Sequence, residues 1–144
     1  EALVARKLGV VGWALYASSG YLLAHGRPRL GHGLAGHAVI ALDGDLKGTP
    51  GGRWLLQHGG KARVALRCND LVAAMRACEA GFGLAMVPSI VAHDAAVERV
   101  SAEAMIAVDA WLVMHRQVQK TARVRAVADF LVGLFADERA TLAG

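Results

Sequence analysis

Cys68, Asn69 and Asp70 are the side chains of this sequence best placed to bind a ligand. They stand where an alternating segment gives way to a helical pattern, so the unpaired backbone N–H groups at the start of that helix would lie beside them. Asn69 offers both a donor and an acceptor, and the N–H groups could hold a carboxylate or another polar group. The alternative is plain helix capping. Asp70 favours it, because a carboxylate in the first turn satisfies the helix dipole and opposes an anionic ligand by ~1 kcal/mol.

Ser18 is a second candidate for ligand binding. Ser18 or Ser19 is expected to cap a short helix that ends before Gly26. We expect this helix start to face the same edge of the fold as Asn69, so that both could contact one ligand.

The six histidines do not have the spacing of metal ligands. His32 and His37 lie five residues apart in a Gly-rich stretch, and no cysteine or pair of acids accompanies any histidine at ligand spacing. For nucleophilic catalysis, Cys68 or Ser89 would need a neighbouring base, and the sequence contains no GxSxG motif. In GFGLAM the glycines follow a helix and precede a strand, the reverse of a dinucleotide fingerprint. We therefore expect no metal, no cofactor, no catalytic residue and no enzymatic activity.

The two cysteines, Cys68 and Cys78, do not indicate a disulfide framework. One is expected at a strand end and the other along the following helix, which makes a bridge between them unfavourable. A redox-sensing thiol at Cys68 is one hypothesis, and a small apolar side chain on a buried strand face is the alternative that the general behaviour of free cysteines favours.

The pattern around the candidate residues predicts a strand, a helix and a second strand. Apolar side chains alternate over residues 63–68 and then recur at helical spacing from Leu71. Gly81 is expected to end the helix, and a second apolar run, 84–87, stops at Pro88. A unit of this size with short joints is most simply a right-handed crossover in a parallel sheet, so we expect an α/β fold. Ligands of such sheets collect beyond the carboxyl ends of the strands, where the three candidate residues would lie.

Other segments give weaker signals. Residues 3–17 indicate an extended segment interrupted near Gly9 and Gly12. A strand is expected over residues 37–42, and the Gly-rich residues 43–52 are expected to form a flexible loop.

Toward the end of the chain, residues 102–107 are ambiguous between helix and strand. The short, unbroken apolar run at 111–115 indicates a buried strand. Thr121 is expected to cap a last helix. That helix has one apolar stripe, formed by Val124, Val127, Ala128, Leu131, Leu134 and Phe135.

Length and composition are those of one ordinary domain. The chain has 144 residues, is 55% hydrophobic and carries a formal charge of +4, with most of the excess cations in its first half. A basic surface could favour anionic ligands or nucleic acid, although scattered cations more often only solvate a surface. No apolar run approaches the roughly 20 residues that span a bilayer, and no signal peptide is evident, so we expect a cytoplasmic protein with no membrane partner.

Four stretches resemble the effector-binding domain of LysR-type transcriptional regulators. One runs from Leu66 to Pro88, with its cap at Asn69 and Asp70, its Ala-rich helix and the run GFGLAMVP. The others are LVARKLG followed by WALYASSGYLLAHGRP, then HAVIALD, and finally WLVMHRQVQKTARVRAVADFLVGLF. Together they cover nearly the whole chain in the family's order.

The resemblance implies a type II periplasmic-binding-protein-like domain, in which an effector binds in the cleft between two lobes. Residues 13–108 would form one nearly complete lobe, with a mainly parallel sheet flanked by helices. Residues 1–12 and 109–144 would supply the hinge and a remnant of the other lobe, with its returning strand and C-terminal helix. The chain would then be a partial effector-binding domain, expected to lack the helix-turn-helix domain through which alone the intact protein contacts DNA.

The implied function is effector sensing in a bacterial transcription regulator. A small metabolite would bind near Ser18, Cys68, Asn69 and Asp70 and modulate DNA binding by the intact protein. The alternative is a stand-alone solute-binding domain of periplasmic-binding-protein fold. We also expect self-association, as a homodimer, because the apolar stripe of the last helix would lack its main packing partner.

Overall fold

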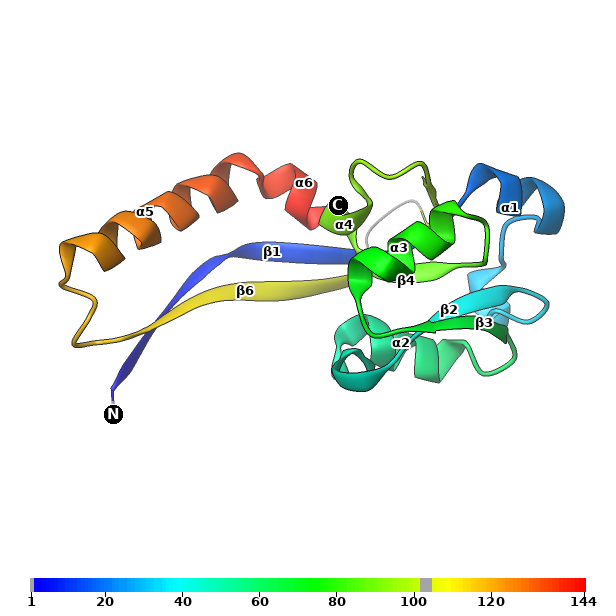
Figure 1. Cartoon of the computed structure of the whole chain (residues 1–144), viewed down its shortest axis with the longest axis horizontal. Helices are drawn as coiled ribbons and strands as arrows, with labels where there is room; N and C mark the ends of the chain where they lie inside the picture. The colour runs from blue at the N-terminus through cyan, green and yellow to red at the C-terminus, as the bar shows by residue number, and fades with distance from the viewer. Residues whose placement is uncertain (1, 102–104) are drawn as a thin grey trace.

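The computed structural model describes residues 2–101 and 105–144. Figure 1 shows an elongated molecule, with a compact α/β part at one end and a long β-ribbon carrying a helix at the other. The first strand, β1 (Leu3–Ala17), runs through both parts. Residues 102–104, which belong to the segment with an ambiguous prediction, lie outside the described residues.

The compact part contains three strands that run in the same direction. β2 (Ala38–Leu42) pairs in parallel with β3 (Arg63–Cys68), and a parallel bridge from Val39 to Leu84 places β4 (Ala85–Pro88) on the other side of β2. The predicted parallel arrangement of β3 and β4 is therefore confirmed, with β2 lying between them. β1 runs antiparallel to β4, and the short β5 (Glu98–Arg99) pairs antiparallel with the end of β1.

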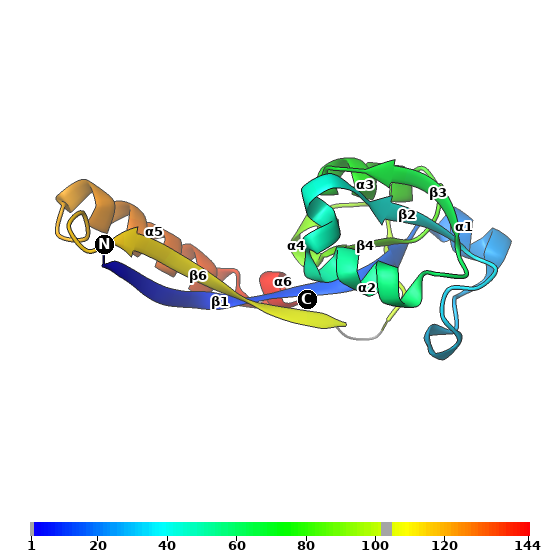
Figure 2. The same cartoon turned by 90° about the horizontal axis from the view of Figure 1, so that it is seen from below.

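Helices connect these strands in the compact part, which Figure 2 shows from a second side. Both α2 and α3 pack against β2 and β4. The helical segments of this part are α1 (Ser19–His25), η1 (Leu30–His32), η2 (Gly44–Gly48), α2 (Pro50–His58), α3 (Leu71–Glu79) and α4 (Ser89–Ala92).

Helix α3 begins and ends as its sequence predicts. The Asp70 carboxylate accepts a hydrogen bond from the N–H of Ala73 at 2.7 Å. At the other end Gly81 has φ of +82°, and its N–H donates to the carbonyl of Cys78 while that of Phe82 donates to the carbonyl of Ala77. This pair of bonds is a Schellman motif, which satisfies carbonyls that a helix end leaves free. Phe82, which follows Gly81, lies beyond the helix and is exposed.

The prediction of a flexible loop over residues 43–52 is wrong. Residues 44–48 form η2, and α2 starts at Pro50, with the Thr49 hydroxyl accepting a hydrogen bond from the N–H of Gly52 at 3.2 Å. Gly51 and Gly52 are buried, and a Cβ atom on Gly51 would lie 2.5 Å from the Trp13 ring. These glycines allow close packing, whereas composition alone suggested flexibility.

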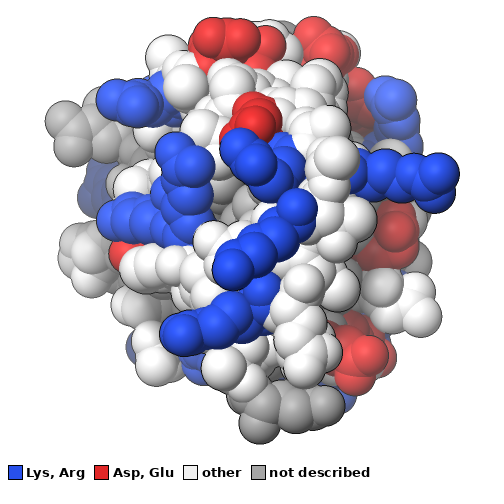
Figure 3. Space-filling view, turned by 90° about the vertical axis from the view of Figure 1, so that its left-hand side faces the viewer, with Lys and Arg blue, Asp and Glu red and all other residues white. Residues whose placement is uncertain are grey.

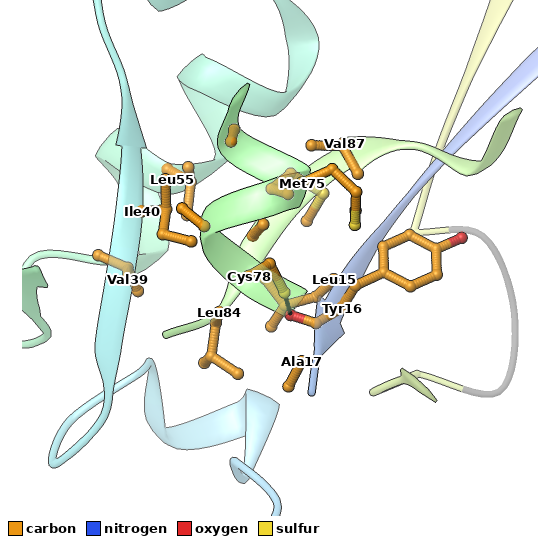
Figure 4. Packing of buried hydrophobic residues seen from close by; sticks show 14 of the residues in the cluster. Leu15, Tyr16, Ala17, Val39, Ile40, Leu55, Met75, Cys78, Leu84 and Val87 are labelled. Carbon is orange, nitrogen blue, oxygen red and sulfur yellow. Dashed lines mark hydrogen bonds between the residues drawn. The ribbon is translucent and has the colours of Figure 1, made fainter. Parts of the chain in front are cut away.

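The hydrophobic core lies in the compact part. Figure 4 shows side chains from β1, β2, α2, α3 and β4 meeting around α3. Leu15, Ile40 and Met86 are almost fully buried, and burying such a side chain contributes about 1.5–3 kcal/mol. The Cys78 thiol belongs to the same core and donates a hydrogen bond to the carbonyl of Tyr16 at 3.3 Å. Both cysteines are free thiols.

The ribbon consists of the first part of β1 and β6 (Ile106–His115), paired antiparallel from Leu3 to Trp13. The register shifts between Lys7 and Gly9, near one of the two predicted interruptions, yet the strand continues. α5 (Ala122–Asp137) packs on one face, where Phe135 lies beside Gly9.

The opposite face of the ribbon is open. Trp111 is 55% exposed, Val113 is 52% exposed, and the side chains that alternate with them are only half-buried, so the predicted strand at residues 111–115 is present but its predicted burial is wrong. They alternate in burial because α5 covers only one face. α5 itself exposes Val127, Phe130 and Leu134, which belong to or border its predicted stripe.

The chain ends by returning to the compact part. α6 (Arg139–Ala143) contacts β1 and α4, and Arg99 donates a hydrogen bond to the carbonyl of Gly144 at 2.8 Å. Thr121 precedes α5 as predicted, but its side chain makes no capping bond.

Candidate functional site

The carboxyl ends of β2 and β3 meet at one edge of the parallel sheet, which we call the carboxyl edge. The N–H of Asp43, just after β2, donates to the carbonyl of Cys68, at the end of β3, at 2.8 Å. Gly44 lies against Asn69, since a Cβ on this glycine would be 3.7 Å from the Asn69 Cβ. Parallel strands bring these residues together because their ends share one side of the sheet.

Asn69 and Asp70 differ in whether their side chains make hydrogen bonds within the protein. The Asp70 carboxylate is the N-cap of α3, which confirms the capping interpretation for this residue. The Asn69 side chain is exposed and makes no hydrogen bond within the described part of the chain. Its amide is therefore free to donate to and accept from a bound molecule at the start of α3.

Cys68 lies at the same edge but is buried. Its side chain is 9% exposed, and burial, with a smaller contribution from the Asp70 carboxylate, raises the pKa of its thiol. A thiol held in its neutral form is a poor nucleophile and a poor redox sensor. The geometry favours the structural interpretation of Cys68.

Charged side chains beside the carboxyl edge were not singled out from the sequence. The Lys47 ammonium contacts the Asp43 carboxylate at 2.8 Å, and this hydrogen bond, with one from the N–H of Gly44, lowers the pKa of Asp43. Lys47 and Arg67 line a hollow of about 210 Å³ between α2 and the strands. Their placement near the carboxyl ends of two adjacent parallel strands, Arg67 within β3 and Lys47 after β2, is the signal that could have identified them.

The structure does not bring Ser18 to the carboxyl edge. β1 runs antiparallel to β4, so its end lies at the opposite edge of the sheet, next to the C-terminal end of α3. The Ser18 hydroxyl accepts a hydrogen bond from the N–H of Tyr21 at 3.1 Å and faces Gly81. Ser18 caps α1 as predicted, but the expectation that it shares an edge with Asn69 is not met.

Ser18 and Glu79 line a separate hollow of about 490 Å³ between α1 and the end of α3. The Glu79 carboxylate there is bound by Arg76 at 2.6 Å and by the N–H of Ala96 at 2.8 Å. The polar groups of this hollow thus largely satisfy one another.

Within residues 2–101 and 105–144, no three or more His, Cys, Asp or Glu side chains come together as a metal site. No helix in this part of the chain is both long and apolar enough to cross a bilayer.

The architecture is that of a type II periplasmic-binding-protein-like α/β fold, with three parallel strands, flanking helices and an antiparallel strand leading in from a second part. A sequence model described as "LysR substrate binding domain" matches residues 1–136. The chain belongs to this family of transcription-regulator effector-binding domains. A comparison with curated protein sequences gave no significant match.

Solved structures share the fold. The regulatory domain of CrgA, a LysR-type transcriptional regulator from Neisseria meningitidis, superposes with a TM-score of 0.73 at 21% identity, over 92% of this chain and 69% of that one. The full-length Vibrio cholerae virulence activator AphB superposes with a TM-score of 0.68 at 23% identity, over 92% of this chain and 48% of AphB. The CcmR regulatory domain of Synechocystis PCC6803, in complex with 2-PG, superposes with a TM-score of 0.68 at 15% identity, over 92% of this chain and 67% of the CcmR domain. This chain thus spans about half the length of a full-length regulator of similar fold.

Proposed function

We propose that this chain is the effector-sensing part of a bacterial LysR-type transcription regulator, acting in the cytoplasm. A small metabolite binds at the carboxyl edge and favours one pre-existing arrangement of the intact protein over another, which changes its DNA binding. The ligand is bound and released without chemical change, so the chain is not an enzyme. Operator recognition belongs to a helix-turn-helix domain outside these 144 residues.

The free amide of Asn69 is the observation that carries this proposal. It lies beside the start of α3, whose first N–H groups favour partial negative charge on a ligand. Asp70 opposes a fully anionic group at that position, so a neutral hydrogen-bonding group of the effector fits Asn69 best. Lys47 and Arg67 would attract any anionic group toward the neighbouring hollow. The CcmR regulatory domain, which shares the fold, was solved in complex with the small molecule 2-PG, and this supports a small-molecule ligand here.

The division into parts supports a cleft at this edge. We propose that residues 13–108 form one lobe, and that residues 1–12 and 109–144 form the hinge and part of the other lobe. Trp13 marks this boundary, because it pairs with Pro88 of β4 and also with Ile106 of β6. A stand-alone solute-binding domain is less well supported, because the matching family consists of regulators.

An Asn69→Ala variant tests the site. In a metabolite screen by thermal shift and calorimetry that includes 2-PG, we expect a hit whose affinity falls about fivefold to 150-fold in the variant, as for the loss of a hydrogen bond worth about 1–3 kcal/mol. Gln57→Ala is the matched control, since it removes an exposed amide from α2. A hit that binds both variants as tightly as the original chain would remove Asn69 from the site.

We also propose that the chain self-associates through the exposed apolar surface of α5 and the ribbon. Phe130 is 65% exposed, and Val127 and Leu134 lie beside it on the helix. Such a contiguous apolar patch is typical of an interface. In sedimentation velocity at micromolar concentration we expect a dimer that Phe130→Gln weakens. Leu23→Gln, on α1, is the control, and a strictly monomeric profile of the original chain would contradict the proposal.

A further inference from the structure

Five cations gather at the free end of the ribbon, and we call this set the basic end. They come from β1, from the turn after β6, and from the first turns of α5, and all five are exposed. Figure 3 shows Lys and Arg side chains gathered over this end of the molecule. The basic end consists of Arg6, Arg116, Lys120, Arg123 and Arg125.

Two hollows join these segments. Arg6 and Arg125 line a hollow of about 220 Å³ between the ribbon and α5. Arg116 and Lys120 line another, of about 420 Å³, beside the end of β6. Segments that are more than a hundred residues apart in the sequence thus place their cations on one continuous surface.

The charges of the basic end are not balanced by the protein around them. None of the five cations makes an ion pair with a residue in the described part of the chain. In the compact part, by contrast, some exposed cations are paired, as Arg27 is with Glu98 at 2.6 Å and Lys47 with Asp43 at 2.8 Å. Asp129 lines the same hollow as two of the cations, yet lies beyond ion-pair distance of both. Like charges held together in this way repel one another until an anion binds.

Helix α5 adds to the imbalance because its charges oppose its own dipole. Arg123 and Arg125 lie near its N-terminus, and its first turn contains no acid. A cation at that end is unfavourable, because the N-terminus of a helix carries partial positive charge. A bound anion would relieve both this cost and the mutual repulsion of the basic end.

We propose that the basic end binds the phosphate backbone of duplex DNA, without reading its sequence. The cations spread over three segments, which suits a repeating row of phosphates better than a single small anion. Gln117, Gln119 and Thr121 lie among them, and such side chains commonly contact phosphate oxygens. Trp111 pairs with Lys7, so its side chain lies on the opposite face of the ribbon from Arg6 and does not add an aromatic stacking surface beside that cation. The inference rests on the proposed function only in that the intact protein is a regulator that binds DNA.

Fluorescence anisotropy of the 144-residue chain with a labelled duplex of arbitrary sequence tests this inference. Neutralising about five phosphates predicts a slope of about −4.5 in log K against log salt, so affinity should fall on the order of 10²- to 10³-fold between 50 and 200 mM salt. A variant with Arg116→Gln, Lys120→Gln, Arg123→Gln and Arg125→Gln should reduce this slope to about −1. Its thermal midpoint should not fall, because removing cations from the start of α5 relieves the dipole.

The matched control removes four exposed cations of the compact part, with Arg29→Gln, Arg53→Gln, Lys61→Gln and Arg63→Gln. Both variants have the same net charge, so only the position of the lost cations differs. Duplex binding that survives in the control and is lost in the first variant supports the inference. Equal losses in both variants, or binding to phosphatidylserine vesicles without binding to duplex, would overturn it. Neither operator sequence nor effector enters the measurement, so a failed effector screen would leave this result unaffected.

Discussion

In the native protein, Cys78 should be alkylated more slowly than Cys68, the other cysteine. Burial raises the pKa of its thiol to about 12, and its proton is donated to the Tyr16 carbonyl. At pH 7 the thiolate fraction is then on the order of 10⁻⁵, against about 3% for a free cysteine with a pKa near 8.5. Because the thiolate is the reacting form, native Cys78 should react about 10³-fold more slowly than the same residue in the unfolded chain.

The assay is mass-spectrometric counting of iodoacetamide adducts over time at pH 7, in buffer and in guanidinium chloride. Cys68→Ala and Cys78→Ala variants report each thiol separately. Cys68 should also be protected, although less strongly, because its thiol is less deeply buried. Native labelling of Cys78 at the denatured rate would refute the core packing of α3. Rapid oxidation of Cys68 by peroxide would instead restore the redox-sensor hypothesis for that residue.

Three further predictions concern packing, pH and capping. Gly51→Ala should destabilise the fold by about 1–3 kcal/mol in urea denaturation, because its Cβ would lie 2.5 Å from the Trp13 ring. Gly20→Ala is the control, since its Cβ would meet no atom within 4 Å, and it should be neutral or stabilising. Burial, with a smaller effect of a neighbouring histidine, lowers the pKa of His37, so the unfolded chain binds more protons as pH falls through 6.5. The fold should therefore lose stability between pH 7 and pH 5, and His37→Gln should reduce that loss. Asp70→Ala should cost about 0.5–2 kcal/mol of unfolding free energy, and an unchanged urea midpoint would contradict its role as N-cap.

The β3–α3–β4 unit could be predicted from the sequence because each of its signals is local. A change of period from two to 3.6, a capping aspartate and a left-handed glycine all lie within a few residues of the feature that they determine. The short loops on either side of the helix then indicated that the two strands are parallel. The meeting of Asp43 with Cys68 and Asn69 is a direct consequence of that parallel arrangement.

Features that depend on distant contacts were predicted poorly. Gly51 resembles a loop residue until the Trp13 ring, almost forty positions earlier, is placed against it. The edge that Ser18 faces depends on the antiparallel direction of β1, which no local pattern encodes. Trp111 belongs to an apolar run, and its burial depends on whether anything covers the second face of the ribbon.

β1 gives the molecule a continuous backbone from one end to the other. Its fifteen residues are hydrogen-bonded to β6 over the first part and to β4 over the second, and the two ladders overlap at Trp13. A rod built in this way resists stretching and in-plane bending far more than torsion. A motion that transmits a signal along it should therefore twist the ribbon or bend it out of its plane, and the ladder is irregular at the register shift between Lys7 and Gly9.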